Sequence, residues 1–536
     1  MFADSSHKSE FLCLYCILIL ATFWVTEALP PAVTSMLPIF MFPALGILDT
    51  ELTCMCYFRE TTMMFVGSLI VAITIEYSGL HVRFALKCLL LIGSSHRRLS
   101  AGLFLVTMFI SMWITNTAAT AMMAPIVTAI LQTLEEEGMC KYFRTSPESV
   151  PATIPKPSRT TLCYFLGIAY SASIGGTGTY VGTGTNLSAR DQIEKFFPNS
   201  LPAFHRWMAV AIPPMLVDIG CLWVWMNFLF LGLLWKGGCD PEIRETLLES
   251  KQRRREMEKT IRKVIEEKYA ALGPIRWNEV LTGLVFVLCV FLWLLRAPQV
   301  IPGWADRIVD LSYMNDPSLP QKNNTVLKKK YRMKDAGAAF FVDLLLFTLP
   351  GTPLFLHFCN PKANKVPGSK GPALVVWEVV QQRMPWGLIF VIGCGFAIAE
   401  ASSVSGMSSM IGSYLAALRH VPQFWIVFIC CFMATNITEF TSNVAVLNIL
   451  GPVIGSMGLE LDMNGAYLFV PVAICCSFSF MLPVGTPPNA VVAGMANIRT
   501  EDMIIAGTGP TVFTLISTTV FVHLLSGPLF TEHNVS

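Results

Sequence analysis

Long apolar blocks recur along this sequence and constrain its fold more than any other feature. Five examples are Phe11–Leu29, Met208–Trp235, Val280–Leu295, Trp386–Ala401 and Ile505–Leu525. A helix of about 20 apolar residues crosses the ~30 Å hydrocarbon core of a bilayer, and helices satisfy their own backbone hydrogen bonds there. Charged residues make up only 14% of the chain, whereas a soluble protein carries about 25%. The sequence therefore predicts an all-α polytopic membrane protein with about ten spans.

Polar runs between the apolar blocks indicate which side of the membrane each connection occupies. Basic residues are concentrated in His96–Ser100, Glu135–Arg159 and Lys236–Tyr269, and basic connections tend to stay in the cytoplasm. Asn323 and Asn534 each begin a glycosylation sequon, which is modified only outside the cytosol. The count of spans places both asparagines outside, although a basic run follows Asn323. We therefore expect a cytoplasmic helix near residue 250 and an extracellular C-terminus.

Two short loops repeat in distant parts of the chain. "VGTGTNL" at Val181–Leu187 resembles "VGTPPNA" at Val484–Ala490, and each lies inside an apolar stretch. Upstream, "SMWITNTA" at Ser111–Ala118 resembles "TEFTSNVA" at Thr438–Ala445 at one constant offset. A glycine-rich span also precedes each polar tip. Three elements, namely the span, the tip and the loop, therefore recur in the same order. The sequence therefore indicates an internal duplication of roughly residues 11–235 and 275–525.

The duplication predicts where a binding site lies. Each copy contains an odd number of crossings by the apolar blocks, so the second copy enters the membrane from the opposite side. Inverted repeats of this kind place a site near the midplane, where broken helices meet. Gly182, Gly485 and the Pro487-Pro488 pair break helices there. Free N–H groups on one half-helix suit a carboxylate, and free C=O groups with Ser, Thr and Asn oxygens suit a small cation.

These motifs resemble those of the divalent-anion/sodium symporter (DASS) family, which carries two Ser-Asn-Thr-type hairpin tips and two unwound Gly-Thr loops. "FWVTEALP" at Phe23–Pro30, "GWAD" at Gly303–Asp306 and Met481–Met503 add to the likeness, and the insect INDY-type citrate and dicarboxylate transporters are the most similar branch. The resemblance implies an elevator fold: a homodimeric scaffold and a transport domain with two re-entrant hairpins and two unwound helices. It also implies transport of citrate and dicarboxylates, with Na⁺ as a possible coupling ion.

The resemblance also assigns residues. Its substrate-binding signature falls on Thr115, Asn116, Thr117, Thr183, Ser442, Asn443, Val444 and Thr486. Its first cation site falls on Ser111, Thr115, Asn116 and Gly182, and its second on Thr438, Thr441, Asn443 and Gly485. Thr115 stands where the family usually has Ser, and Val444 replaces a Thr. Each Asn can serve twice, because an amide offers an oxygen to a cation and N–H donors to a carboxylate.

The expected domain organisation follows the duplication. We expect an N-terminal tail at 1–10, scaffold helices at 11–100 and a first transport half at 101–235 with its unwound segment at 181–187. A cytoplasmic amphipathic helix is expected at 236–274. The second scaffold unit follows at 275–418 with an extracellular loop at 298–335, the second transport half at 419–526 with an unwound segment at 484–490, and an outer tail at 527–536.

Several readings of the function remain open at this stage. No HExxH, P-loop or GxSxG motif occurs in the sequence, so nothing supports an enzyme. A plasma-membrane carrier for citrate and dicarboxylates, working by symport or exchange, is the leading hypothesis. A sulfate or other oxyanion carrier, an anion channel and a non-transporting carboxylate sensor are the alternatives. Six acidic residues lie in apolar segments, where charge is often functional: Glu27, Glu76, Asp218, Asp343, Glu400 and Glu439. Of these, Glu439 adjoins a hairpin tip. Two roles are open for it: it tunes cation or proton coupling, or it makes a structural hydrogen bond.

Overall fold

The computed structural model describes residues 7–26, 28–92, 96–136, 141–144, 156–198, 200–232, 251–296, 303–313, 333–352, 373–415, 420–483 and 485–530. In the first half the helices and strands are α1 (Lys8–Thr26), α2 (Pro31–Thr34), α3 (Leu37–Ala44), α4 (Thr50–Tyr57), α5 (Glu60–Ser78), α6 (Leu80–Ile92), α7 (His96–Ser111), α8 (Asn116–Glu136), β1 (Phe143–Arg144), β2 (Lys156–Pro157), α9 (Arg159–Gly176), α10 (Gly184–Phe196) and α11 (Phe204–Phe230). The second half contains α13 (Lys251–Ala271), α14 (Trp277–Leu294), α15 (Trp304–Tyr313), α17 (Asp335–Thr348), α19 (Trp377–Arg383), α20 (Trp386–Val404), α21 (Met407–Leu415), α22 (Gln423–Ile437), α23 (Asn443–Glu460), α24 (Gly465–Cys476), α25 (Pro487–Ala496) and α26 (Thr500–Phe530). The predicted all-α class is confirmed.

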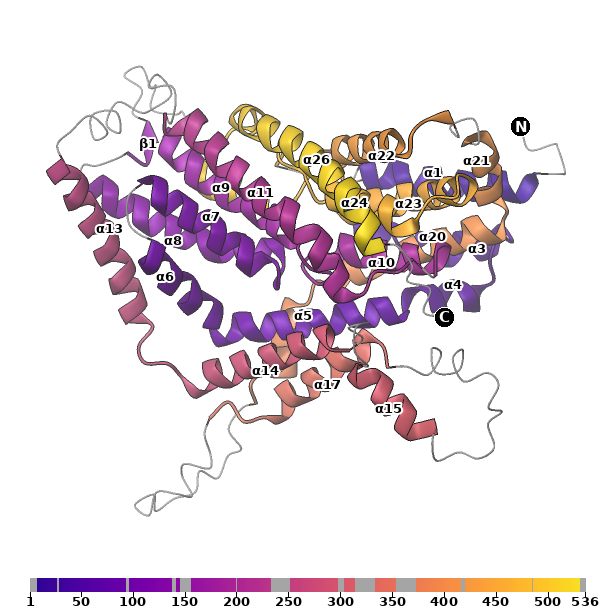
Figure 1. Cartoon of the computed structure of the whole chain (residues 1–536), viewed down its shortest axis with the longest axis horizontal. Coiled ribbons are helices and arrows are strands. Elements are labelled where there is room, and N and C mark those ends of the chain that lie inside the picture. Colours follow the sequence, from indigo (N-terminus) through magenta and orange to yellow (C-terminus); the bar gives the residue numbers. More distant parts are fainter. Residues whose placement is uncertain are drawn as a thin grey trace, which may run out of the picture.

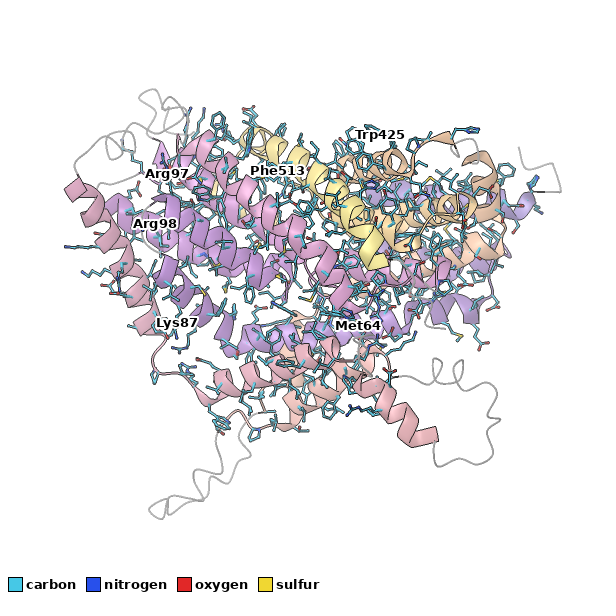
Figure 2. All side chains as sticks on the ribbon, in the orientation of Figure 1. Met64, Lys87, Arg97, Arg98, Trp425 and Phe513 are labelled. Atoms are coloured by element: carbon cyan, nitrogen blue, oxygen red, sulfur yellow. The ribbon has the colours of Figure 1, made fainter. Side chains whose placement is uncertain are left out.

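Eight helices in the described part of the chain are long and apolar enough to cross a membrane. Three further apolar helical segments are shorter: Pro31–Ala44, Gln423–Ile437 and Gly465–Cys476. The count of about ten from the sequence differs because prolines and polar turns divide some apolar blocks into shorter helices. Large apolar side chains also remain exposed on the outer helices, among them Trp425 on α22, which Figure 2 labels at the upper surface. An apolar exterior of this kind suits contact with lipid.

Two helical hairpins form where the sequence repeats its polar tips. Helix α7 ends at Ser111 and α8 begins at Asn116, whereas α22 ends at Ile437 and α23 begins at Asn443. The segments after each hairpin are broken helices: residues 177–183 separate α9 from α10, and residues 477–486 separate α24 from α25. Both predicted unwound segments therefore exist, although their second parts, from Gly184 and from Pro487, are helical.

The second helix of each broken pair, α10 or α25, packs against the other half of the chain. Helix α10 packs against α23 and α24 of the second half, and α25 packs against α8 and α9 of the first. Figure 1 shows α10 beside α20 and α24, apart from the first-half group of α7, α8 and α9. The long helices α11 and α26 also lie against each other. Equivalent elements therefore make equivalent contacts, as a duplicated chain with internal symmetry requires.

Helix α13 corresponds to part of the cytoplasmic helix expected at 236–274. It packs against α6 and α8, and the Arg83 guanidinium lies 5.6 Å from the centre of the Tyr269 ring. Arg83 also donates to the carbonyl oxygens of Leu272, Gly273 and Pro274, which follow α13 directly, so the helix is attached to the first-half bundle. Asn323, Asn534, Glu27 and Val484 lie outside the described residues, as does much of the loop expected at 298–335.

Candidate functional site

Each hairpin tip is closed by the same set of three oxygens. The Ser111 hydroxyl oxygen lies 2.7 Å from Asn116 Oδ1 and 2.8 Å from the Ala172 carbonyl oxygen. In the second half the Thr438 hydroxyl oxygen lies 2.8 Å from Asn443 Oδ1 and 2.6 Å from the carbonyl oxygen of Cys476. A hydroxyl has one proton, so it satisfies only one of two acceptor oxygens at a time. Each tip therefore gathers more oxygen acceptors than it has hydrogens to share.

Each unwound loop is closed by an asparagine amide. Asn186 Nδ2 donates to the carbonyl oxygens of Gly176 and Thr179, at 3.0 and 2.7 Å. Asn489 Nδ2 donates to the equivalent carbonyl oxygens of Ser479 and Leu482, at 3.0 Å each. The two amides stand at equivalent places in the repeat and both side chains are buried. The sequence motif thus specifies a loop geometry as well as a break in the helix.

The tip and the loop of each half are also joined directly, at equivalent positions but by different chemistry. In the first half the Thr179 hydroxyl donates to the carbonyl oxygen of Met112 at 2.6 Å. In the second half Glu439 stands at the position of Met112, and its carboxylate accepts from the backbone N–H groups of Phe480, Met481 and Leu482. The Ser479 hydroxyl donates to the same carboxylate at 3.2 Å. These four donors support the structural reading of Glu439 over a role in coupling.

One cavity lies between the two tips and the two loops. Its volume is about 490 Å³. All eight predicted substrate-binding residues line it: Thr115, Asn116, Thr117, Thr183, Ser442, Asn443, Val444 and Thr486. Gly182 and Gly485 line it as well, together with Phe65 of α5 and Val391 of α20. The structure therefore brings residues from four distant parts of the chain around a single space.

Four helices begin at this cavity. Helix α8 begins at Asn116, α10 at Gly184, α23 at Asn443 and α25 at Pro487, and each of these residues lines the space. A helix N-terminus carries roughly half a positive charge and unpaired N–H groups. Ser442 and Thr486 are the residues that precede α23 and α25, and neither side chain bonds the helix it precedes. Their hydroxyls are therefore not used as caps.

The lining contains no Lys, Arg, His, Asp or Glu among the described residues. Among the described lining residues, the contributions to the local electrostatic potential come from the four helix N-termini and from hydroxyl and amide dipoles. Such a site favours an anion without the full charge of a buried arginine or lysine. This arrangement is suited to reversible binding of a carboxylate or another oxyanion.

Three of the predicted cation-site residues lie behind the cavity wall instead of on it. Ser111, Thr438 and Thr441 are buried, and they are absent from the lining. The Thr441 hydroxyl donates to the Trp24 carbonyl oxygen of α1 at 3.0 Å. The oxygen sets at Ser111 and Thr438 match the preference of small hard cations for oxygen ligands. No cluster of His, Cys, Asp and Glu that could hold a metal ion occurs in the described parts of the chain.

A network of ion pairs on α10 was not predicted from the sequence. The residues of α10 in this network are Arg190, Asp191, Glu194 and Lys195. Arg190 lies 3.0 Å from Asp335 and 3.6 Å from Glu60, and it contacts Met64, which Figure 2 labels on α5. Asp191 pairs with Arg59, Glu194 with Lys334, and Lys195 with Glu400. Every one of these pairs joins α10 to α5, α17, α20 or the residue that precedes one of them.

The other acidic residues of the apolar segments have varied surroundings. Glu76 pairs with Arg383 at 3.0 Å, and Glu400 pairs with Arg59 at 2.9 Å. Asp218 of α11 accepts a hydrogen bond from Ser517 of α26. Asp343 of α17 is buried, and neither of its carboxylate oxygens has a hydrogen-bond partner in the structure. Three of these four are thus paired, as expected of residues that hold helices together.

Comparisons with known proteins agree with the fold. A family model described as the sodium:sulfate symporter transmembrane region matches residues 4–531. The protein called I'm not dead yet of Drosophila melanogaster is 41% identical over 526 residues, which are 96% of this chain and 84% of the relative. The mouse Na(+)/citrate cotransporter is 35% identical, over 92% of this chain and 87% of the relative. The human Na(+)/dicarboxylate cotransporter 3 is 34% identical, over 92% and 84%.

Among solved structures, the YdaH transporter of Alcanivorax borkumensis is similar in fold. The alignment covers 98% of this chain and 99% of that chain, with a TM-score of 0.53. The sequences are only 13% identical, so this likeness concerns the fold alone.

Proposed function

The chain belongs to the sodium:sulfate symporter family of membrane transporters, and on this premise we propose that it is a secondary active transporter that couples Na⁺ to the movement of citrate and dicarboxylates. The observation that carries the proposal is the cavity at which four helix N-termini converge, and whose described lining residues include no charged side chain. A substrate with two or three carboxylates needs several separate anion sites, and two symmetrical pairs of helix N-termini supply them.

The amides at the two tips have the orientation that the proposal needs. Asn116 Oδ1 and Asn443 Oδ1 face the hydroxyls of Ser111 and Thr438, so each Nδ2 is left to donate to a substrate carboxylate. The hydroxyls of Thr183, Ser442 and Thr486 lie around the same space. A hydrogen bond to a charged group is worth about 1.5–3 kcal/mol. A few such contacts select the substrate and still allow its release.

The oxygen sets behind the cavity wall are where we place the coupling cations. One set comprises Ser111, Asn116 and the Ala172 carbonyl, with Thr115 from the same tip and Gly182 from the unwound loop beside it. The other comprises Thr438, Asn443 and the Cys476 carbonyl, with Thr441 from the same tip and Gly485 from its unwound loop. Because each Asn serves both the cation and the substrate, binding of Na⁺ orients the amide that donates to the carboxylate. The cation would partly neutralise the negative charge of the substrate beside it.

The elevator mechanism and the domain boundaries are part of the proposal. The transport domain comprises 101–235 and 419–526, and the scaffold comprises 11–100 and 275–418. The ion pairs of α10 then join the transport domain to the scaffold, because α5, α17 and α20 belong to the scaffold. Sliding of α10 past these helices breaks the pairs, so they favour the conformation described here. We also propose a homodimer in the plasma membrane with an extracellular C-terminus and glycans at Asn323 and Asn534.

Sulfate is the second candidate substrate, because the matching family model is described by sodium and sulfate and a helix N-terminus binds any oxyanion. The test is uptake of radiolabelled citrate into liposomes that contain the purified protein, with external sodium or choline and with unlabelled sulfate as competitor. We expect saturable uptake that requires sodium and is not displaced by sulfate. Uptake that persists in choline contradicts sodium coupling, and displacement by sulfate favours the oxyanion carrier.

Asn443→Ala provides the link from this uptake to the cavity. Loss of the Asn443 amide removes a hydrogen-bond donor to a charged substrate, so citrate uptake should fall at least about tenfold. Asn436→Ala is the matched control, because Asn436 lies seven residues earlier, is exposed and donates to the Phe432 carbonyl oxygen within α22. Equal uptake by the two variants would show that citrate crosses by another route. Continuous conductance in a planar bilayer would instead indicate a channel, and binding without uptake a sensor.

A further inference from the structure

Asn186 and Asn489 have buried amide oxygens with no partner. Both side chains are fully buried, and each Nδ2 is fully used by two backbone carbonyl oxygens. Neither Asn186 Oδ1 nor Asn489 Oδ1 has a hydrogen-bond partner in the structure. Native proteins rarely leave a buried amide oxygen unpaired. The same unpaired oxygen at two symmetry-related positions therefore calls for one explanation.

The carbonyl groups that these amides hold belong to the ends of broken helices. Gly176 is the last residue of α9, and Ser479 follows the end of α24. Carbonyls at a helix C-terminus lack partners within the helix and carry partial negative charge. An amide that donates to two of them at once fixes the path of the loop between them. The amide thereby keeps both carbonyl groups from turning away.

These loops lie directly against the oxygen sets of the hairpin tips. A Cβ atom built on Gly176 would lie 2.2 Å from Asn116 Oδ1, and one built on Gly182 would lie 2.4 Å from the Gly176 carbonyl oxygen. In the second half a Cβ atom on Gly485 would lie 1.8 Å from the Ser479 hydroxyl oxygen and 2.9 Å from the Glu439 carbonyl oxygen. Only glycine allows the backbone to come this close. The carbonyl groups that accept from the Asn186 and Asn489 amides therefore lie next to the residues that form the tips.

We infer that Asn186 and Asn489 are positioning residues for the two coupling cations. Each holds its loop so that the backbone faces the oxygen set of the adjacent tip, and its free amide oxygen gains a partner, directly or through a water molecule, when the cation binds. This inference rests on the proposed sodium-coupled function and deepens it. It assigns to the last Asn of each Gly-Thr-x-x-Asn loop a role in sodium affinity that is separate from contact with the substrate.

The test uses sodium alone, without citrate, so that it does not depend on transport. The melting temperature of the purified protein is measured as sodium replaces choline at constant ionic strength. For Asn186→Ala and Asn489→Ala, the sodium concentration that gives half of the stabilisation should rise about tenfold, as is typical when a residue that orients metal ligands is lost. The same shift should appear in the sodium dependence of citrate uptake.

Asn227→Ala is the matched control. Asn227 of α11 is also buried, donates to the Trp223 carbonyl oxygen at 2.7 Å and has an amide oxygen without a partner. Its other contact is Ser100, which lies roughly 16 Å along α7 from Ser111 at 1.5 Å per residue. Its replacement should lower the melting temperature at every sodium concentration and leave the half-saturating concentration unchanged.

The outcomes separate this inference from the function on which it rests. If the wild-type protein takes up citrate but is not stabilised by sodium, sodium coupling is wrong and the inference falls with it. If sodium stabilises the wild-type protein and the two alanine variants respond as Asn227→Ala does, only the inference is wrong. Should an alanine variant fail to fold, the isosteric Asn186→Asp and Asn489→Asp replace it. They keep an oxygen but lose both N–H donors, so an unchanged sodium response in them overturns the positioning role.

Discussion

Gly176→Ala is expected to abolish citrate uptake while the protein still folds and reaches the membrane. The added Cβ atom would lie 2.2 Å from Asn116 Oδ1 and 2.7 Å from Thr183 Cγ2. Both neighbours belong to the proposed substrate site, so the methyl group displaces the tip amide and the loop together. Because a displacement of about 1 Å costs on the order of a hundredfold where groups must be aligned, we expect uptake below detection. Surface labelling of the same cells checks that the variant is present.

Gly494→Ala is the control for this substitution. Gly494 lies on α25, which also begins at the cavity, but a Cβ atom there would meet nothing within 4 Å. Alanine also favours a helix over glycine by up to about 1 kcal/mol. Uptake by Gly494→Ala should therefore match that of the wild type. If Gly176→Ala also transports normally, the tip and the loop of the first half do not form the site.

Arg190→Met is expected to have the largest effect on stability. Arg190 is buried, and its guanidinium faces Asp335 at 3.0 Å and Glu60 at 3.6 Å. Removal of one member of a buried ion pair typically costs about 3–5 kcal/mol. Asp335 keeps Arg296 as a partner, so the carboxylate that loses its pairing cation is that of Glu60. The melting temperature of the purified protein should fall, and Arg190→Lys should recover part of the loss because it restores the charge without the planar fork.

The matched control is Arg262→Met on α13. Arg262 also pairs with a glutamate, Glu266 at 2.8 Å, but both side chains are more than half exposed. An exposed pair of this kind contributes roughly 0–1 kcal/mol, so little change in melting temperature is expected. Equal effects of Arg190→Met and Arg262→Met would mean that the network on α10 does not hold this conformation.

The candidate site was predictable because the chain is duplicated. A single Ser-Asn or Gly-Thr pair in an apolar segment is common, but the repeat of "SMWITNTA" and "TEFTSNVA" with one offset singles out Asn116 and Asn443. Glycines and prolines then show where the helices break. The structure places all eight predicted substrate residues around one cavity, which supports the assignment. Local sequence is informative here because the features that form the site, namely tips, breaks and helix starts, are local.

The ion pairs of α10 could not be predicted in the same way. Arg190 and Asp335 are far apart in the sequence, and the sequence around each reads as an ordinary charged stretch. Their pairing depends on the packing of α10 between helices of both halves, which no periodicity reveals. The partners of Glu439 were equally hidden, because its four donors come from a loop about forty residues later. Long-range partners of a buried charge are set by the tertiary fold.

Equilibrium binding of radiolabelled citrate to the purified protein tests most directly whether both halves of the repeat form one site. Asn116→Ala and Asn443→Ala each remove one tip amide, and the tips lie on either side of the same cavity. The account predicts one citrate per protein chain, with the affinity reduced at least about tenfold by either substitution. Full binding by either variant, or two independent citrate sites per chain, would contradict a single site built by the two repeats together.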